Sequence, residues 1–239
     1  LDSAVPLDLA FVDEHGKDVT LAQYFTGARP AVLALVYYEC PMLCTQVLNG
    51  LFRSIDPLKL DAGKDFDIVV VSFDPGETPA MAMAKKTSYL KHYQRPTAEA
   101  GIHFLTGRQP AIDKLADAVG FRYAYDETID QYAHPAAVTV LTPNGHVSKY
   151  LYGVEFAPMD FRFAMVSAGE GTIGTLIDQA LIYCFHYAPA TGKDSVAIMS
   201  FVLLAGVLTP VGIAAFILIH LRRERRQNGA VVSTATGTR

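Results

Sequence analysis

The chain has 239 residues, a formal net charge of −4 and 18% charged residues. A balance this close to neutral, without a basic patch, argues against a nucleic-acid-binding protein, and we expect no nucleic acid among its partners. The length suits one ordinary domain with an added segment, and neither a fixed-period repeat nor a low-complexity block divides it.

The N-terminal part of the chain predicts a short hairpin and then a buried strand. Residues 7–12 show a strand pattern, residues 13–16 form a turn, and a polar return strand ends at Thr20. The continuous apolar run at residues 31–38 predicts a strand that is buried on both faces.

Two cysteines follow this strand directly, in the segment Cys40-Pro-Met-Leu-Cys44, and a helix is predicted to continue through Ile55. If Cys40 caps the helix and Pro41 occupies its first turn, the spacing places both sulfur atoms on one side of that turn. The positive end of the helix would then favour both thiolates. Because the chain has only three cysteines, a disulfide-stapled scaffold is excluded, and the close pair indicates a redox or metal site.

The rest of this part alternates strands and helices, a pattern typical of an α/β sandwich. A second buried strand is predicted at residues 68–73, and a hairpin joins residues 136–141 and 147–152 around a Pro-Asn-Gly turn. Helical patterns occupy residues 80–93, 110–119, 158–168 and 173–183.

His134 stands just before the third buried strand, far from the cysteines in sequence. If that strand runs opposite to its neighbours, its start meets the end of the strand that precedes Cys40. Two thiolates and one imidazole suit a soft ion of low coordination number such as copper(I). Structural zinc would require a fourth ligand that the sequence does not identify.

Three sequence blocks together resemble the Sco/SenC family over about residues 5–153. They are Tyr38-Glu-Cys-Pro-Met-Leu-Cys44, Val71-Ser-Phe-Asp-Pro-Gly-Glu-Thr-Pro79, and His134 ahead of a strand and the Pro-Asn-Gly turn. The resemblance implies a thioredoxin-like domain, a sandwich of the glutaredoxin type, tethered to a membrane. It also implies a Cu(I)/Cu(II) site made by Cys40, Cys44 and His134.

The same resemblance implies a copper metallochaperone that helps to build the binuclear copper centre of cytochrome c oxidase. The copper-bearing subunit of the oxidase would be its partner, together with other copper chaperones or respiratory subunits. Asp74 matches an aspartate near the family's site, where an outer-shell role is expected. One departure from the family pattern concerns the membrane anchor. Familiar members carry it at the N-terminus, whereas the span predicted in this chain is C-terminal.

Other functions stay open at this point. A thiol-disulfide oxidoreductase would use Cys40 and Cys44 through mixed disulfides to keep the oxidase cysteines reduced. The wide Cys-x-x-x-Cys spacing and His134 argue against it, because simple exchange needs neither. The helical segments after Gly153 suggest an accessory subunit of a respiratory complex. A peroxidase is a weaker candidate, because Thr45 has no evident arginine partner.

An uncharged stretch at residues 196–221 predicts a transmembrane helix, which we place at residues 195–221. As a helix it would span roughly 39 Å, enough for a hydrocarbon core of about 30 Å. Four arginines directly follow it, whereas the charges just before it cancel, so the C-terminus should be cytoplasmic. The arginines are Arg222, Arg223, Arg225 and Arg226.

The predicted organisation is a thioredoxin-like domain at residues 1–188, a linker at 189–194, the single membrane helix and a cytoplasmic tail at 222–239. We expect the domain on the periplasmic side of a bacterial inner membrane, and a first residue of Leu1 fits removal of an export signal. Cys184 and His186 are expected in an aromatic belt at the membrane interface rather than in a second metal site.

Overall fold

The structure is a computed structural model. It describes residues 1–128, 131–173, 206, 209–210 and 213. Contacts divide the chain into two units, the first comprising Leu1–Tyr183 with Pro189–Thr191 and the second Cys184–Ala188 with Gly192–Arg239. All the described helices and strands lie in the first unit.

The predicted membrane helix lies outside the described residues except for Gly206, Thr209, Pro210 and Ile213. Within the part of the chain that the structure does describe, no helix is both long enough and apolar enough to cross a bilayer. The helix predicted at residues 173–183 lies outside the description beyond Ile173, as do the linker at 189–194 and the tail at 222–239. These assignments stay predictions.

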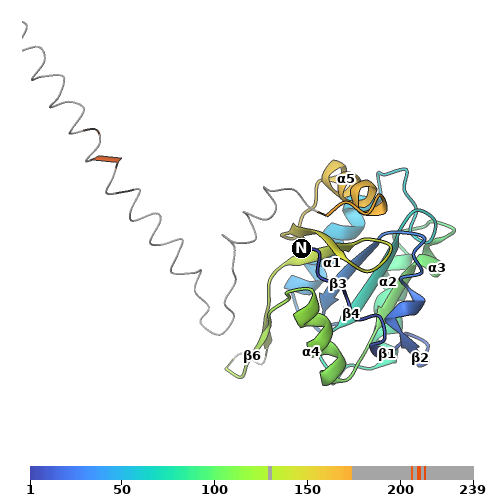
Figure 1. Cartoon of the computed structure of the whole chain (residues 1–239). Helices are drawn as coiled ribbons and strands as arrows, with labels where there is room; N and C mark the ends of the chain where they lie inside the picture. Colours follow the sequence, from blue (N-terminus) through green and yellow to red (C-terminus); the bar gives the residue numbers. More distant parts are fainter. Residues whose placement is uncertain (129–130, 174–205, 207–208, 211–212, 214–239) are drawn as a thin grey trace, which may run out of the picture. The chain divides into compact units, whose positions relative to one another are not determined.

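A five-stranded sheet in the order β5-β4-β3-β8-β9 forms the centre of the fold (Figure 1). Its first three strands are parallel, and β8 and β9 run antiparallel to their neighbours. Every residue of β3 and β4 is buried, as expected for central strands covered on both faces. The strands are β3 (Ala31–Val36), β4 (Asp67–Ser72), β5 (Ile102–Leu105), β8 (Ala137–Leu141) and β9 (Val147–Tyr152).

Helices make the parallel crossovers and cover the sheet. The helix α1 joins β3 to β4, and α2 joins β4 to β5; Phe52 of α1 stacks on Tyr89 of α2 with ring centroids 4.6 Å apart. The helix α5 contacts α1, β8 and β9. The helices are α1 (Leu43–Ile55), α2 (Pro79–Leu90), α3 (Ala98–Gly101), α4 (Gln109–Ala118) and α5 (Pro158–Gly169), with a 3-10 helix at Leu21–Gln23.

Two small hairpins complete the described part. The first pairs β1 (Ala10–Val12) with β2 (Asp18–Thr20). The second pairs β6 (Ala124–Asp126) with β7 (Gln131–Ala133) and lies beside α4 (Figure 1). Because β7 ends one residue before His134, this second hairpin determines where the histidine enters the domain.

The structure confirms the first hairpin, both buried strands, the hairpin of β8 and β9 and the helices corresponding to α1, α2, α4 and α5, with small shifts at their ends. It adds α3, β5 and the β6–β7 hairpin, which the sequence analysis missed. The result is a mixed α/β fold with a central sheet, consistent with the expected thioredoxin-like fold.

Candidate metal centre

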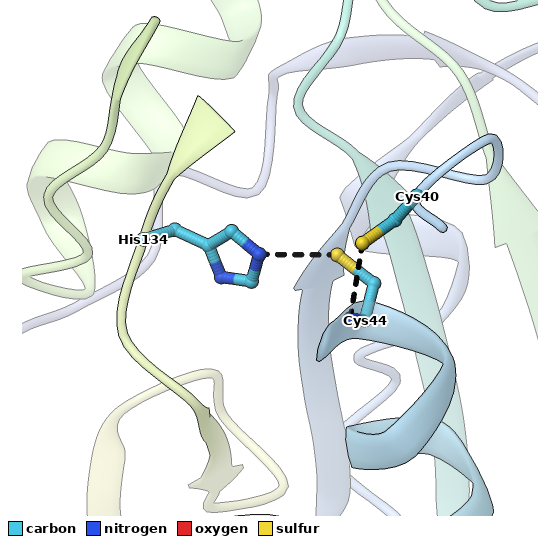
Figure 2. Close-up of side chains that lie close together, drawn as sticks. All are labelled: Cys40, Cys44 and His134. Atoms are coloured by element: carbon cyan, nitrogen blue, oxygen red, sulfur yellow. Dashed lines mark hydrogen bonds between the residues drawn. The ribbon is translucent and has the colours of Figure 1, made fainter. Parts of the chain in front are cut away.

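Three side chains from distant parts of the sequence meet at one end of the sheet (Figure 2). Cys40 lies in the turn after β3, Cys44 in the first turn of α1, and His134 between β7 and β8. Their potential ligand atoms all lie within 4.8 Å of one another. The three residues are only 7%, 0% and 7% exposed, respectively, so the site is largely shielded from bulk solvent.

The antiparallel orientation of β8 explains why His134 reaches the cysteines. In the pairing of β3 with β8, Ala31 lies opposite Leu141 and Leu33 opposite Thr139, so the start of β8 lies towards the end of β3. The sequence analysis predicted this meeting from the expected strand direction, and the register confirms it.

The arrangement in which Cys40 caps α1, considered in the sequence analysis, is not the one observed. The N-cap residue is Met42, and the helix begins at Leu43, so Cys40 lies outside it. The reason is a turn in which the Cys40 N–H donates to the Tyr37 carbonyl at 3.3 Å. The Cys40 sulfur still satisfies one amide of the first helical turn, because it accepts a hydrogen bond from the Cys44 N–H at 3.3 Å (Figure 2).

The sequence analysis expected the helix start to favour both thiolates, but the pKa values of the two cysteines shift in opposite directions. Hydrogen bonding from the Cys44 side chain, with the backbone N–H groups of Cys44 and Met42, holds the pKa of Cys40 well below its usual range. Burial and the hydrogen bond with Cys40 instead raise the pKa of Cys44. No disulfide joins the two cysteines. In the metal-free chain, the negative charge therefore resides on Cys40.

The ring of His134 is oriented for binding through Nε2. That nitrogen lies 3.2 Å from the Cys44 Sγ, and Nδ1 lies 3.0 Å from the Pro135 carbonyl oxygen. We assign the proton to Nδ1, which donates to this carbonyl and leaves the Nε2 lone pair facing the sulfur. Rings of Phe73 and Phe121 pack against the imidazole at centroid distances of 5.3 and 5.9 Å.

Glu77 supports the cysteine turn and was missed by the sequence analysis. Its buried carboxylate accepts hydrogen bonds from the N–H groups of Tyr38 and Glu39, both at 2.8 Å, and from the Ser72 hydroxyl at 2.5 Å. Burial raises the pKa of this carboxyl group. A signal was present, because Glu77 is the acidic residue inside the Pro-Gly-Glu-Thr-Pro segment that follows a buried strand.

Asp74 lies outside the close group of Cys40, Cys44 and His134. Its carboxylate accepts a hydrogen bond from the Gly76 N–H at 2.8 Å and so shapes the turn after β4. An outer-shell role for Asp74 stays a prediction. Cys184 and His186 lie outside the described residues.

The donor set fits a soft metal ion. Two sulfur atoms and one imidazole nitrogen are the ligands that copper(I) prefers, and a three-ligand set suits its low coordination number. The same two thiols are close enough in sequence and space to favour disulfide chemistry as well. The geometry is therefore compatible with copper binding and with thiol exchange.

Comparisons with known proteins identify the family and the fold of this chain. The SCO1/SenC family model matches residues 3–159. Among solved structures, a protein of Aquifex aeolicus VF5 is 26% identical, with a TM-score of 0.63, covering 74% of this chain and 98% of its own. Arabidopsis thaliana ScoI, solved with copper bound, is 22% identical, with a TM-score of 0.53, and the match covers 68% of this chain and 96% of that one.

A SCO1/SenC family lipoprotein from Bacillus anthracis is 18% identical and superimposes with a TM-score of 0.56. That match covers 70% of this chain and 96% of the lipoprotein. The search among curated protein sequences found no significant match. The Arabidopsis thaliana and Bacillus anthracis structures show a likeness of fold alone. The family model, by contrast, matches the sequence over most of the described domain.

Proposed function

The chain belongs to the SCO1/SenC family, and from this premise we propose that it binds copper and delivers it during assembly of cytochrome c oxidase. The observation that carries the proposal is the buried group of Cys40, Cys44 and His134, whose ligand atoms lie within 4.8 Å of one another. Copper is the cargo in this account, and the binuclear copper centre of the oxidase is its destination.

Loading follows from the ionisation of the site. Copper(I) binds the Cys40 thiolate and displaces the proton of Cys44, so uptake releases a proton to solvent. The Nε2 atom of His134 supplies the third ligand. A site with three ligands keeps a position open for a ligand from an acceptor, which suits transfer better than storage.

Delivery is ligand exchange without electron transfer. Cysteine and histidine side chains of the oxidase subunit replace the three donors one after another, and copper(I) keeps its charge. Loss of two electrons from Cys40 and Cys44 would instead form a disulfide, which no longer offers thiolates to the metal.

Membrane anchoring is part of the proposal. The helix predicted at residues 195–221 would hold the domain on the periplasmic side of the inner membrane, with the tail at 222–239 in the cytoplasm. Confinement beside a membrane-embedded oxidase raises the effective concentration of the domain there. Removal of residues 195–239 should then shift the protein from the membrane fraction to the soluble fraction, and retention in membranes would refute this anchor.

Thiol-disulfide exchange is a second candidate, because Cys40 is held as a thiolate beside the thiol of Cys44. The near-complete burial of both residues weighs against it, since a mixed disulfide needs access to the attacking sulfur. An accessory role in a respiratory complex would be compatible with either chemistry.

A two-arm experiment separates the candidates. In one arm, the copper(I)-loaded 239-residue chain is mixed anaerobically with the reduced, copper-free oxidase subunit, and formation of its binuclear centre is followed by absorption. In the other arm, the copper-free reduced chain is mixed with the disulfide form of that subunit. We expect copper transfer in the first arm; rapid reduction in the second without transfer in the first would favour the oxidoreductase.

A further inference from the structure

The donors of the copper site offer little surface to an acceptor. Cys40 and His134 are each 7% exposed, and Cys44 is completely buried. An acceptor that takes copper by ligand exchange must nevertheless place a donor atom on the ion. Transfer therefore requires a route between the buried site and the protein surface.

Met42 lies between the two cysteines and faces the solvent. It is 64% exposed, the largest value among the exposed large hydrophobic residues that the structure describes. Its backbone is fixed on both sides, because its carbonyl accepts from the Gln46 N–H at 3.0 Å and its N–H hydrogen-bonds the Cys40 sulfur. The side chain thus starts beside a copper ligand and extends into solvent.

The chemistry of the Met42 side chain suits an intermediate ligand for copper(I). A thioether is a soft donor that selects this ion, and three rotatable bonds allow the sulfur to change position. It is neutral, so binding and release need no proton. It also forms no disulfide, so it does not interfere with Cys40 and Cys44, as a third thiol at the same place would.

We propose that Met42 is the transfer ligand of the site: its Sδ binds copper(I) as the ion leaves the buried donors, and a ligand of the acceptor then displaces it. The inference rests on the proposed function and adds a residue that has no role in the resting donor set of Cys40, Cys44 and His134.

The transfer balances without an oxidant or a reductant. The bond between copper and Nε2 of His134 breaks as the bond to Sδ of Met42 forms, and copper stays in the +1 state. Two thiolates of a dithiol acceptor then replace Cys40, Cys44 and Met42 on the ion. The acceptor thiols lose two protons: one is taken up, through solvent, by the Cys44 thiolate, and the other stays in solvent because Cys40 returns to its thiolate form.

An exposed methionine beside a metal site also suits a merely apolar contact with a partner. Met42→Leu separates the two explanations, because leucine keeps an apolar side chain of similar volume and lacks the sulfur. A matched control is Met159→Leu, since Met159 is 50% exposed on α5 and lies outside the copper site.

The test uses the full chain, loaded anaerobically with one copper(I), and the chelator bicinchoninate as the acceptor. For Met42→Leu, we expect transfer to slow by about tenfold or more. Its copper(I) affinity at equilibrium should stay within about twofold of the parent, because methionine is absent from the resting site. Met159→Leu should transfer at the parental rate.

Parental transfer by Met42→Leu would overturn the inference, and so would an equal loss of affinity and rate. If the parent chain takes up no copper, the proposed function fails as well. A parent that binds copper, with a Met42→Leu variant that transfers it normally, removes only the role of Met42.

A second measurement detects the contact directly. In the His134→Ala variant, the third ligand position is vacant, so Met42 should occupy it when copper(I) is added. The chain is labelled with ¹³C at the methionine methyl groups, and the Met42 signal is identified by its loss in Met42→Leu. We expect copper(I) to shift this signal while that of Met159 stays in place, and an unchanged Met42 signal would contradict the proposal.

Discussion

The two cysteines of the proposed copper site have pKa values shifted in opposite directions because their surroundings differ. Cys40 accepts hydrogen bonds from the Cys44 side chain and from two backbone N–H groups, which hold its pKa well below the usual range. Cys44 is fully buried, and burial raises its pKa. Copper therefore meets one ready thiolate and one thiol that ionises only as the metal arrives.

This asymmetry predicts how the metal-free chain reacts with iodoacetamide. Because the folded pKa of Cys40 is lowered, its alkylation rate should already be constant from about pH 6 upward, whereas an ordinary thiol speeds up about tenfold per pH unit below about 8.5. Cys44 should stay unmodified. Peptide mass spectrometry after timed quenching measures both rates. A Cys40 rate that climbs through pH 8, or earlier labelling of Cys44, would contradict the assignment.

Replacing His134 tests its place as the third ligand. In His134→Ala, we expect the copper(II) affinity to fall by at least tenfold and the thiolate-to-copper(II) absorption band to shift, because the imidazole donor is lost. His146→Ala is the matched control, since His146 is a surface histidine hydrogen-bonded to Asp2. An unchanged spectrum and affinity in His134→Ala would remove this residue from the site.

At the scale of elements, the turn between β3 and α1 depends on two side chains from the segment that follows the neighbouring strand β4. Glu77 binds the N–H groups of Tyr38 and Glu39, while the Lys85 ammonium donates to the Tyr38 carbonyl at 2.8 Å. Both groups come from the segment after β4. The connection to α2 thus fixes the backbone immediately before Cys40.

Glu77→Gln should disturb that turn, although the glutamine side chain is nearly the same size as the glutamate side chain. The amide has only one acceptor oxygen, so at least one buried N–H or hydroxyl loses its partner, at a cost of about 1–3 kcal/mol in the free energy of unfolding. We also expect copper(I) affinity to fall by about 10–100-fold, because the loop that carries Cys40 loosens. Urea unfolding and chelator competition measure these effects. Glu39→Gln, on the exposed side of the same turn, should match the parent; equal effects of the two substitutions would contradict the role of Glu77.

The central elements could be predicted from the sequence because their patterns are local. All six residues of β3 and of β4 are buried; β3 is apolar throughout, and β4 contains the apolar run Ile68–Val71 between Asp67 and Ser72. The strand β5 has only four residues, with the polar His103 among them, and it forms because β4 offers a parallel edge. That edge is a tertiary feature that no short window of sequence contains.

The sequence indicated which residues meet at the candidate site, but not the hydrogen bonds and burial around them. The order of blocks and the resemblance to a family indicated Cys40, Cys44 and His134 together. The anchoring of the turn by Glu77 depends on a long-range contact, whereas the start of α1 at Leu43 follows from the local turn between Tyr37 and Cys40. The unequal charge of the two thiols follows from burial, which sequence spacing does not reveal.

At the scale of the whole domain, a buried ion pair joins the first hairpin to the sheet and α2. The Lys86 ammonium lies 2.6 Å from the Glu14 carboxylate and 3.0 Å from that of Glu99. The other oxygen of Glu14 accepts from the Phe104 N–H in β5 at 3.1 Å. His103 packs at the same edge, with its ring 4.4 Å from that of Tyr24.

His103 makes the stability of the domain depend on pH. Burial lowers its pKa in the folded chain from 6.5 to about 4, so the unfolded chain binds more protons between these values. The free energy of unfolding should therefore fall as the pH drops from 6.5 towards 4, by at most about 1.4 kcal/mol per pH unit from this group. In His103→Gln this part of the slope should vanish.

Urea unfolding of the parent and the variant across that pH range measures the difference, and the contributions of the carboxylates cancel in the comparison. His92→Gln, at an exposed position, serves as the control. Parallel pH profiles for the parent and His103→Gln would contradict the account of this edge.

X-ray absorption at the copper edge tests the central claim most directly. The 239-residue chain, loaded with one equivalent of copper(I) under reducing conditions, should show a first shell of two sulfur atoms and one nitrogen atom, from Cys40, Cys44 and His134. Failure to retain copper, or a shell made only of oxygen and nitrogen, would contradict the assignment of this buried group as a copper site.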